Sequence, residues 1–159
     1  MTITNLTLLV LSFWFMEFVA WSNHKYIMHR LLWRWHQDHH RKDRQEYLPE
    51  KTGERRFEKN DRFFVIYALP AMVLMVSGIL SGNDSLVFIG IGISLYGFTY
   101  FVVHDLMIHQ RIPVPFLFKN HNFYTKAIIR AHTAHHRPKS QNDFHNYGLL
   151  IVPLRFFKT

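Results

Sequence analysis

Histidines dominate the residues of this chain that could carry chemistry. Twelve of the 159 residues are histidine, and ten of these repeat one spacing twice, an H-x4-H pair followed by an H-x2-H-H triplet. The first copy consists of His24, His29, His36, His39 and His40. The second copy consists of His104, His109, His132, His135 and His136. Neutral imidazole binds iron, zinc, copper and nickel, so the pattern indicates metal binding without naming the metal.

The number of imidazoles favours two metal ions. A structural zinc site needs only four ligands, and the chain has no cysteine, so all ligands are nitrogen or oxygen atoms. On an α-helix, residues three and four apart share a face, so each triplet can direct several rings at one point. The two rings of an H-x4-H pair diverge by about 140°. Such a pair either holds two metals from different sides or includes a break in its helix. His121 and His145 lie outside the pattern, and we expect surface or local hydrogen-bonding roles for them.

Two carboxylates are candidate catalytic residues. Asp105 directly follows His104, where a carboxylate can accept the second N–H of a ligand imidazole and orient the ring. Glu17 lies seven residues before His24 within an apolar run, and a charge there is costly and indicates function. Glu17 could orient a ligand, relay protons or line the polar end of a pocket. The alternative is that its side chain extends toward the membrane surface.

Three long apolar runs predict the elements that position these residues, at about 6–21, 63–81 and 85–103. Nineteen helical residues rise about 28 Å, close to the hydrocarbon thickness of a bilayer. Only "GND" separates the last two runs, which predicts a helical hairpin, and Asn60 or Asp61 is expected to cap its first helix. Segment 147–157 is too short to span, and we expect it to lie in the interface or under the bundle. The prediction is an all-α integral membrane bundle with three or four membrane helices and one domain, 1–159.

The positive charges predict how this bundle is oriented. The formal net charge is +8, and all nineteen Lys and Arg residues lie in two blocks, Lys25–Arg62 and Arg111–Lys158. Basic blocks that alternate with apolar runs are typical of a membrane protein whose basic segments face the cytoplasm, and they argue against nucleic-acid binding. The histidine-rich two-metal site is therefore expected at the cytoplasmic ends of the membrane helices.

Four stretches carry a resemblance to a known family. They are "MEFVAWSNHKYIMH" (Met16–His29), "WHQDHH" (Trp35–His40), "YGFTYFVVHDLMIHQRIP" (Tyr96–Pro113) and "AHTAHH" (Ala131–His136). They resemble the membrane-bound fatty acid hydroxylase and desaturase superfamily and, within it, the bacterial β-carotene 3-hydroxylases. The segment between His40 and Asn60 is longer than expected for that family and the C-terminal tail is shorter, which leaves loop contacts and partner docking open.

The resemblance implies an enzyme of the bacterial inner membrane. Its activity would be O₂-dependent hydroxylation of carotenoid β-ionone rings at carbon 3, from β-carotene through β-cryptoxanthin to zeaxanthin. The family's histidine motifs coincide with the ten residues above, which would hold two iron ions; imidazole also accepts zinc as a substitute.

The electrons for such chemistry are expected from another protein. The chain has no G-x-G-x-x-G nucleotide motif, and a ferredoxin-like donor would be attracted to the basic face. The other expected partners are membrane lipids and the lipid-soluble carotenoid. Alternatives are a carotenoid ketolase or a sterol or fatty-acid oxygenase on the same scaffold. A non-enzymatic membrane metal transporter fits the sequence less well. Transporters place their ligands near the middle of the bilayer, whereas these histidines are expected at the ends of the membrane helices.

Overall fold

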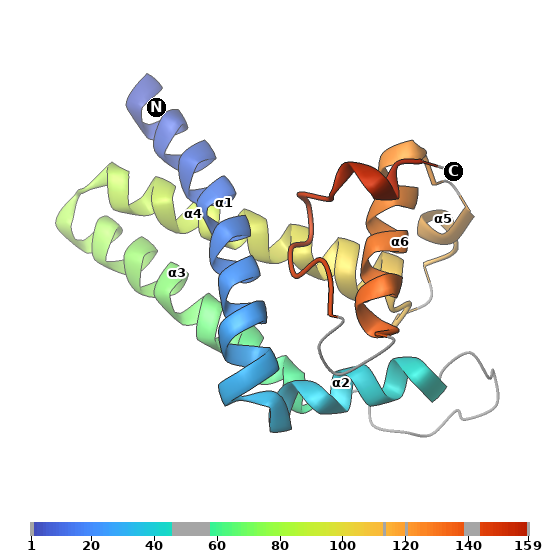
Figure 1. Cartoon of the computed structure of the whole chain (residues 1–159). Coiled ribbons are helices and arrows are strands. Elements are labelled where there is room, and N and C mark those ends of the chain that lie inside the picture. The colour runs from blue at the N-terminus through green and yellow to red at the C-terminus, as the bar shows by residue number, and fades with distance from the viewer. Residues whose placement is uncertain (1, 46–57, 113, 120, 139–143, 159) are drawn as a thin grey trace.

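The computed structural model describes residues 2–45, 58–112, 114–119, 121–138 and 144–158, and these residues contain helices but no strand (Figure 1). In chain order the elements are α1 (Ile3–Asn23), the π-helix η1 (His24–Leu31), α2 (Trp33–Gln45), the 3₁₀ turn η2 (Lys59–Asp61), α3 (Arg62–Ser81), α4 (Asp84–Tyr100), the π-helix η3 (Phe101–Ile108), α5 (Pro115–Lys119), α6 (Phe123–His136) and the 3₁₀ turn η4 (Leu154–Phe156). The all-α prediction is confirmed.

Three helical stretches of the described chain are long and apolar enough to cross a membrane. They are Ile3–Leu31, Lys59–Ser81 and Asp84–Ile108, and each contains one of the three runs predicted from the sequence. Their outward side chains are apolar and exposed, as lipid-facing positions must be; Leu11 is 62% exposed and Leu80 83%. A helix with this composition has no polar face to turn toward water, so the bundle is built for lipid.

The predicted hairpin is formed by α3 and α4. Gly82 ends α3 in the left-handed conformation with φ of 68°, which favours glycine. The Asn83 side chain then caps α4 by accepting a hydrogen bond from the Ser85 N–H at 3.1 Å. The turn therefore reverses the chain within three residues, and the two helices lie side by side (Figure 1).

Helix α4 packs between α3 and α1 through glycines. A Cβ atom at Gly90 would lie 2.8 Å from the Ala71 carbonyl oxygen, and one at Gly92 would lie 2.5 Å from the Leu9 carbonyl oxygen. Small residues at these two positions let the helix backbones approach closely, which is how helices associate where both are surrounded by lipid.

The histidine-bearing elements lie together at one side of the hairpin. Helices α2 and α6 are in contact there, and the chain after α6 returns toward α1 (Figure 1). We call residues Phe144–Ile151 of this return the strap. Leu149 in the strap is buried, whereas Leu154 in η4 is exposed. The predicted segment 147–157 is thus partly packed against the bundle and partly exposed.

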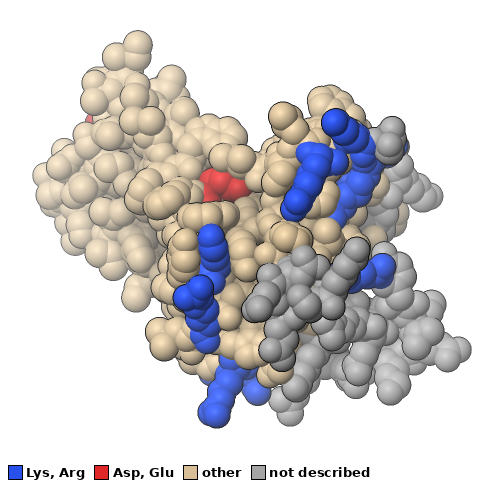
Figure 2. Space-filling view, in the orientation of Figure 1, with Lys and Arg blue, Asp and Glu red and all other residues tan. Residues whose placement is uncertain are grey.

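The positive charges gather around the histidine-bearing elements. In Figure 2, Lys and Arg side chains gather on the half built from η1, α2, α6 and the C-terminal residues, and none is visible on the half built from the α3–α4 hairpin. This is the arrangement expected from the two basic blocks of the sequence.

Candidate metal centre

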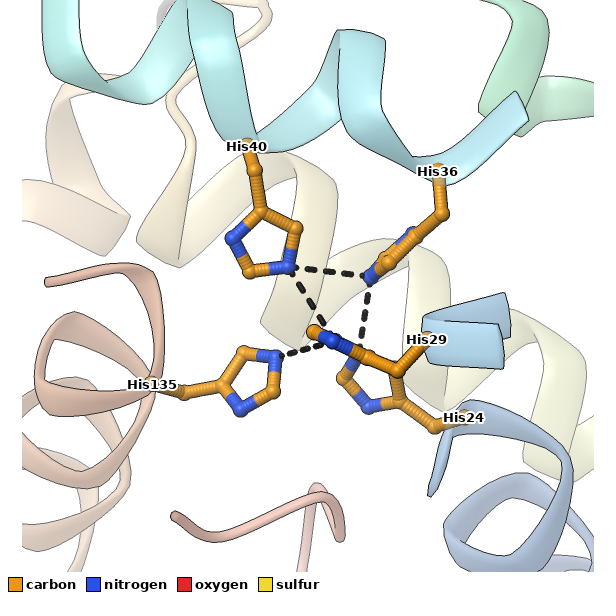
Figure 3. A group of neighbouring side chains, drawn as sticks. All are labelled: His24, His29, His36, His40 and His135. Carbon is orange, nitrogen blue, oxygen red and sulfur yellow. Dashed lines mark hydrogen bonds between the residues drawn. The ribbon is translucent and has the colours of Figure 1, made fainter. Parts of the chain in front are cut away.

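Nine of the ten patterned histidines bring ring nitrogens together in two groups. The first group is His24, His29, His36, His40 and His135. The second group is His39, His109, His132 and His136. Within each group, one nitrogen from every residue lies within 4.8 Å of those of all the others. Figure 3 shows the first group, in which the five rings point toward one another from η1, α2 and α6.

The nitrogens are spaced as ligands of one ion are spaced. In the first group the Nε2–Nε2 distances are 3.0 Å for His24–His36, 3.0 Å for His29–His135 and 3.1 Å for His36–His40. Metal–nitrogen bonds of about 2.1 Å separate neighbouring ligand atoms by about 3.0–3.4 Å. In the second group, His109 and His132 are 2.9 Å apart, and the buried His39 Nε2 has no hydrogen-bond partner among the described residues. Buried polar atoms are normally satisfied, so both groups fit a metal ion.

Two π-helical turns explain how the H-x4-H pairs converge. The His109 N–H donates to the His104 carbonyl at 3.0 Å, and the Leu32 N–H donates to the Ile27 carbonyl at 2.8 Å. These i→i+5 hydrogen bonds widen the helix, so residues five apart lie one turn apart. The ring centroids of His24 and His29 are 5.0 Å apart. The divergence of about 140° assumed the α-helical period, so of the two alternatives the one with a break in the regular helix holds for His24 and His29.

Each triplet is divided between the two groups. Helix α2 gives His36 and His40 to the first group and His39 to the second. Helix α6 gives His132 and His136 to the second group and His135 to the first. Residues four apart stay together, and the residue between them turns to the other side. Each copy of the repeated spacing therefore supplies most of one group and one residue of the other.

The buried imidazoles are held neutral. Burial, with repulsion from neighbouring histidines, lowers the pKa of His36 to about 3, although the contact with Asn60 acts to raise it. Burial and the neighbouring histidines also hold the pKa values of His39, His40, His132 and His135 well below the usual range. A neutral ring keeps one nitrogen lone pair for a metal, so these five histidines are in the form that binds metal at neutral pH.

Polar side chains orient several of the rings from behind. His36 Nδ1 donates to Asn60 Oδ1 at 2.8 Å, and His39 Nδ1 donates to Glu58 Oε2 at 3.0 Å. With the proton on Nδ1, Nε2 is left free to bind a metal, and the ring cannot rotate away. One short stretch before α3 thus orients a ring in each group, since His36 belongs to the first and His39 to the second.

Backbone carbonyls of the strap orient two rings of the first group. His24 Nδ1 donates to the Tyr147 carbonyl at 2.8 Å, and His135 Nδ1 donates to the His145 carbonyl at 2.9 Å. The backbone carbonyl of His145 thus contacts the first group of histidines. Neither the His145 ring nor the His121 ring belongs to either group of nitrogens.

His104 lies beside the second group without belonging to it. Its ring centroid is 4.5 Å from that of His109 and 4.9 Å from that of His132. Its Nδ1 donates to Asp105 Oδ1 at 2.7 Å, the geometry expected of an orienting carboxylate. The roles of His104 as a ligand and of Asp105 as its partner remain predictions.

Asn60 or Asp61 was expected to cap α3, and Asp61 occupies the N-cap position but makes no capping hydrogen bond through its side chain. Its carboxylate instead accepts two hydrogen bonds from the Arg111 guanidinium, at 2.7 and 2.8 Å. Arg111 also lies 3.7 Å from Asp105 Oδ2. This chain of charges ties the start of α3 to the end of η3.

Glu17 is buried, with 2% of the residue exposed. Its Oε2 accepts a hydrogen bond from the Tyr96 hydroxyl at 2.6 Å, and its Oε1 accepts from the N–H groups of Leu149, Leu150 and Ile151 at 2.9 to 3.0 Å. The alternative in which this side chain extends toward the membrane surface is therefore wrong.

An apolar cavity of about 500 Å³ leads to the histidines. Residues of α1, α3 and α4 form its walls, and His24, His104 and His132 line it together with Gly148 and Leu149 of the strap. Phe64 and Phe98 on α3 and α4 also line it, and each is 65% exposed. The cavity therefore connects the lipid-facing side of the hairpin with both groups of histidines.

Comparisons with known proteins agree with this arrangement. A family model described as fatty acid hydroxylase matches residues 9–159. The chain belongs to the fatty acid hydroxylase family. Within that family it is similar to curated beta-carotene hydroxylases of bacteria, as the motifs predicted. No solved structure gives a significant match.

Three of these relatives cover most of the chain. The beta-carotene hydroxylase of Pseudescherichia vulneris is 35% identical over 94% of this chain and 78% of the relative. That of Pantoea ananas is 36% identical over 87% of this chain and 71% of the relative. That of a Paracoccus species is 32% identical over 94% of this chain and 85% of the relative.

Proposed function

We propose that this fatty acid hydroxylase family member hydroxylates the β-ionone rings of carotenoids at carbon 3, using O₂ and two iron ions. The observation that carries the proposal is the meeting of two groups of clustered imidazoles with the end of an apolar cavity among membrane helices. The similarity to curated beta-carotene hydroxylases supports the choice of substrate.

The first group of histidines would hold one iron ion, and the second group with His104 would hold the other. Bound iron would supply an oxidant made from O₂ and two external electrons, strong enough to attack an unactivated C–H bond. The protein's own contribution is to fix the rings. Asn60, Glu58 and the strap carbonyls hold the Nδ1 protons so that the Nε2 atoms face the metals, and Asp105 does the same for His104.

The cavity suits one end of a long apolar substrate. Its volume of about 500 Å³ lies within the usual range for small-molecule pockets, about 300–1,000 Å³. A β-ionone ring and part of the polyene would fill it, while the remainder of the carotenoid stays in the lipid. Holding carbon 3 nearest to the histidines would then select the product by position.

The orientation follows from the charges. We place the basic half of the molecule, and with it the metal centre, on the cytoplasmic side of a bacterial inner membrane. A ferredoxin-like protein, whose surface is acidic, would deliver electrons to this half. The carotenoid would reach the cavity from the bilayer, along the lipid-facing side of the α3–α4 hairpin.

The test is expression of the chain in a bacterium that accumulates β-carotene, grown in air, with the pigments identified by chromatography and mass. We expect β-cryptoxanthin and zeaxanthin, and unchanged β-carotene with the double variant His36→Ala/His40→Ala. Keto products would assign the chain to the ketolases instead, and unchanged β-carotene with well-folded, iron-loaded protein would refute the proposal.

The metal content gives a second test. Purified protein reconstituted with iron should bind two ions per chain, measured by elemental analysis against protein concentration. One ion or none in fully loaded, folded protein would contradict the two-metal site.

A further inference from the structure

Glu17 has a set of partners that a role at the metals does not explain. Among the described residues, its four hydrogen-bond donors are the Tyr96 hydroxyl and three successive amides of the strap. A buried carboxylate that accepts four hydrogen bonds fixes the positions of the groups that donate them. Such a group is suited to holding a segment of chain in place.

The segment that Glu17 holds is the one that orients the first metal group. The Tyr147 carbonyl, which accepts from His24, lies only two residues before the first of the three bonded amides. The Tyr147 ring is also 5.2 Å from the rings of His29 and His135. Phe144, at the start of the strap, packs 4.5 Å from the His29 ring. All of these contacts are made with the first group.

The fit between Glu17 and the strap is close. A Cβ atom at Gly148 would lie 3.0 Å from Glu17 Oε1, so a larger residue there would push the carboxylate away from the amides. Gly148 and Leu149 also line the cavity. A shift of the strap would therefore alter both the first metal group and one wall of the proposed substrate site.

We infer that Glu17 is a positioning residue for the first metal group, acting through the strap. This inference rests on the proposed two-metal function. It differs from proton relay, because the carboxylate is occupied by backbone donors. It also predicts selectivity, since the rings of His39 and His104, in or beside the second group, are oriented by Glu58 and Asp105, outside the strap.

The test measures cobalt(II) affinity in proteins that keep one group each, using the absorption of the bound ion in detergent. His132→Ala/His136→Ala leaves the first group, and His36→Ala/His40→Ala leaves the second. Adding Glu17→Ala should weaken binding about 10- to 100-fold in the former, as loss of an orienting contact does. It should change binding less than twofold in the latter. Equal weakening of both groups, or no change in either, would overturn the inference.

Two further variants keep the test decisive. Tyr96→Phe removes one hydrogen bond but leaves the three strap amides bonded, so the affinity of the first group should fall much less than with Glu17→Ala; an equal fall would overturn the route through the strap. If Glu17→Ala does not fold, Gly148→Ala replaces it, with Gly97→Ala as the matched control because a Cβ atom there meets nothing within 4 Å. Retention of full first-group affinity in folded Gly148→Ala would also count against the inference.

Failure of this inference is distinguishable from failure of the proposed function. The parent chain tests the two-metal site and the carotenoid product, and only the Glu17 and Gly148 variants test the strap. Hydrogen exchange of the Leu149–Ile151 amides, followed by mass spectrometry, adds a readout independent of activity. These amides should exchange slowly in the parent chain and faster in Glu17→Gln, whose neutral amide oxygen is a weaker acceptor than a carboxylate.

Discussion

At the scale of single residues, several of the clustered histidines are oriented by a group that holds one ring nitrogen. His36 is held by a neutral amide, Asn60, and His39 by a carboxylate, Glu58. A carboxylate partner makes an imidazole a stronger donor to a metal than an amide does. The sequence could not show these pairs, because Glu58 and Asn60 are more than eighteen residues from their histidines. The available signal was that both residues come just before an apolar run whose start was expected at the same membrane depth as the histidines.

Substitutions at Asn60 and Glu58 should weaken metal binding by different groups of histidines. Asn60→Ala should lower the affinity of the first group about 10- to 100-fold, and Glu58→Ala should do the same to the second group. Metal titration of the two single-group proteins described above separates the effects. The assignment of groups would be wrong if Asn60→Ala weakened the second group more than the first.

Asp105→Asn keeps the shape of the side chain and removes its charge. Because Asp105 Oδ1 accepts from His104 Nδ1, the variant should stay folded, bind iron about 10- to 100-fold more weakly and regain part of its activity when iron is added. Iron content and turnover are measured together. Normal iron content with lost turnover would instead give Asp105 a direct part in the reaction.

Histidines inside and outside the two groups should differ sharply. Alanine at any of the six triplet positions (His36, His39, His40, His132, His135 or His136) should abolish hydroxylation. His121→Ala and His145→Ala should retain much of it, since the His145 carbonyl that accepts from His135 survives the substitution. Pigment analysis in β-carotene-accumulating cells measures all eight variants. A His145→Ala variant as inactive as His136→Ala would show that the division of ligands is incorrect.

At the scale of elements, the sequence predicted what length and hydropathy determine and failed where the local geometry changes. The three apolar runs became helices with the expected hairpin, because a polar turn between such runs leaves few alternatives. The H-x4-H pairs were expected to diverge, and η1 and η3 bring them together. A π-helical turn leaves no sign in a pattern that assumes 3.6 residues per turn. What the sequence did offer was the H-x4-H spacing itself, which occurs twice and does not fit one face of an α-helix.

The packing of α4 gives a prediction at this scale. Gly92→Ala should destabilise the bundle by about 1–3 kcal/mol, as overpacking does, because its Cβ atom would meet the Leu9 carbonyl oxygen. Gly97→Ala, in the same helix with nothing within 4 Å of the added carbon, should be neutral or slightly stabilising. Thermal unfolding of both variants in the same detergent measures the difference. Equal melting temperatures would mean that α1 and α4 are not closely packed.

At the scale of the whole molecule, the two groups of histidines form only because segments far apart in the sequence come together. The repeated spacing predicted that two histidine clusters meet at one depth, but not that His39 and His135 exchange between them. That exchange depends on how α2 and α6 lie against each other. Segment 147–157 was expected to lie in the interface or under the bundle, and the anchoring of its first residues by Glu17 requires contacts across more than 130 residues. Periodicity along the chain carries no information on such contacts.

Because many imidazoles are buried together, the free energy of unfolding of the whole protein should depend on pH. In the folded, metal-free chain the pKa of His36 is about 3, and the pKa values of four other triplet histidines are also lowered. In the unfolded chain, histidines titrate near about 6.5. Between these values the unfolded chain binds more protons than the folded one, so the free energy of unfolding rises with pH. The stabilisation from neutral burial is fully present above about pH 6.5 and is lost as the pH falls toward 3.

We therefore expect the melting temperature of the metal-free protein in detergent to fall steadily from pH 7.5 to pH 5. Bound metal should raise the melting temperature at pH 7.5, because an ion that binds only the folded chain stabilises it. The gain should shrink on acidification, because protons compete with the ion for the same nitrogens. The His36→Ala/His40→Ala protein provides the control: with fewer buried imidazoles to protonate, its metal-free melting temperature should depend less steeply on pH. An equally steep profile in this variant would mean that groups other than the clustered histidines control the acid sensitivity.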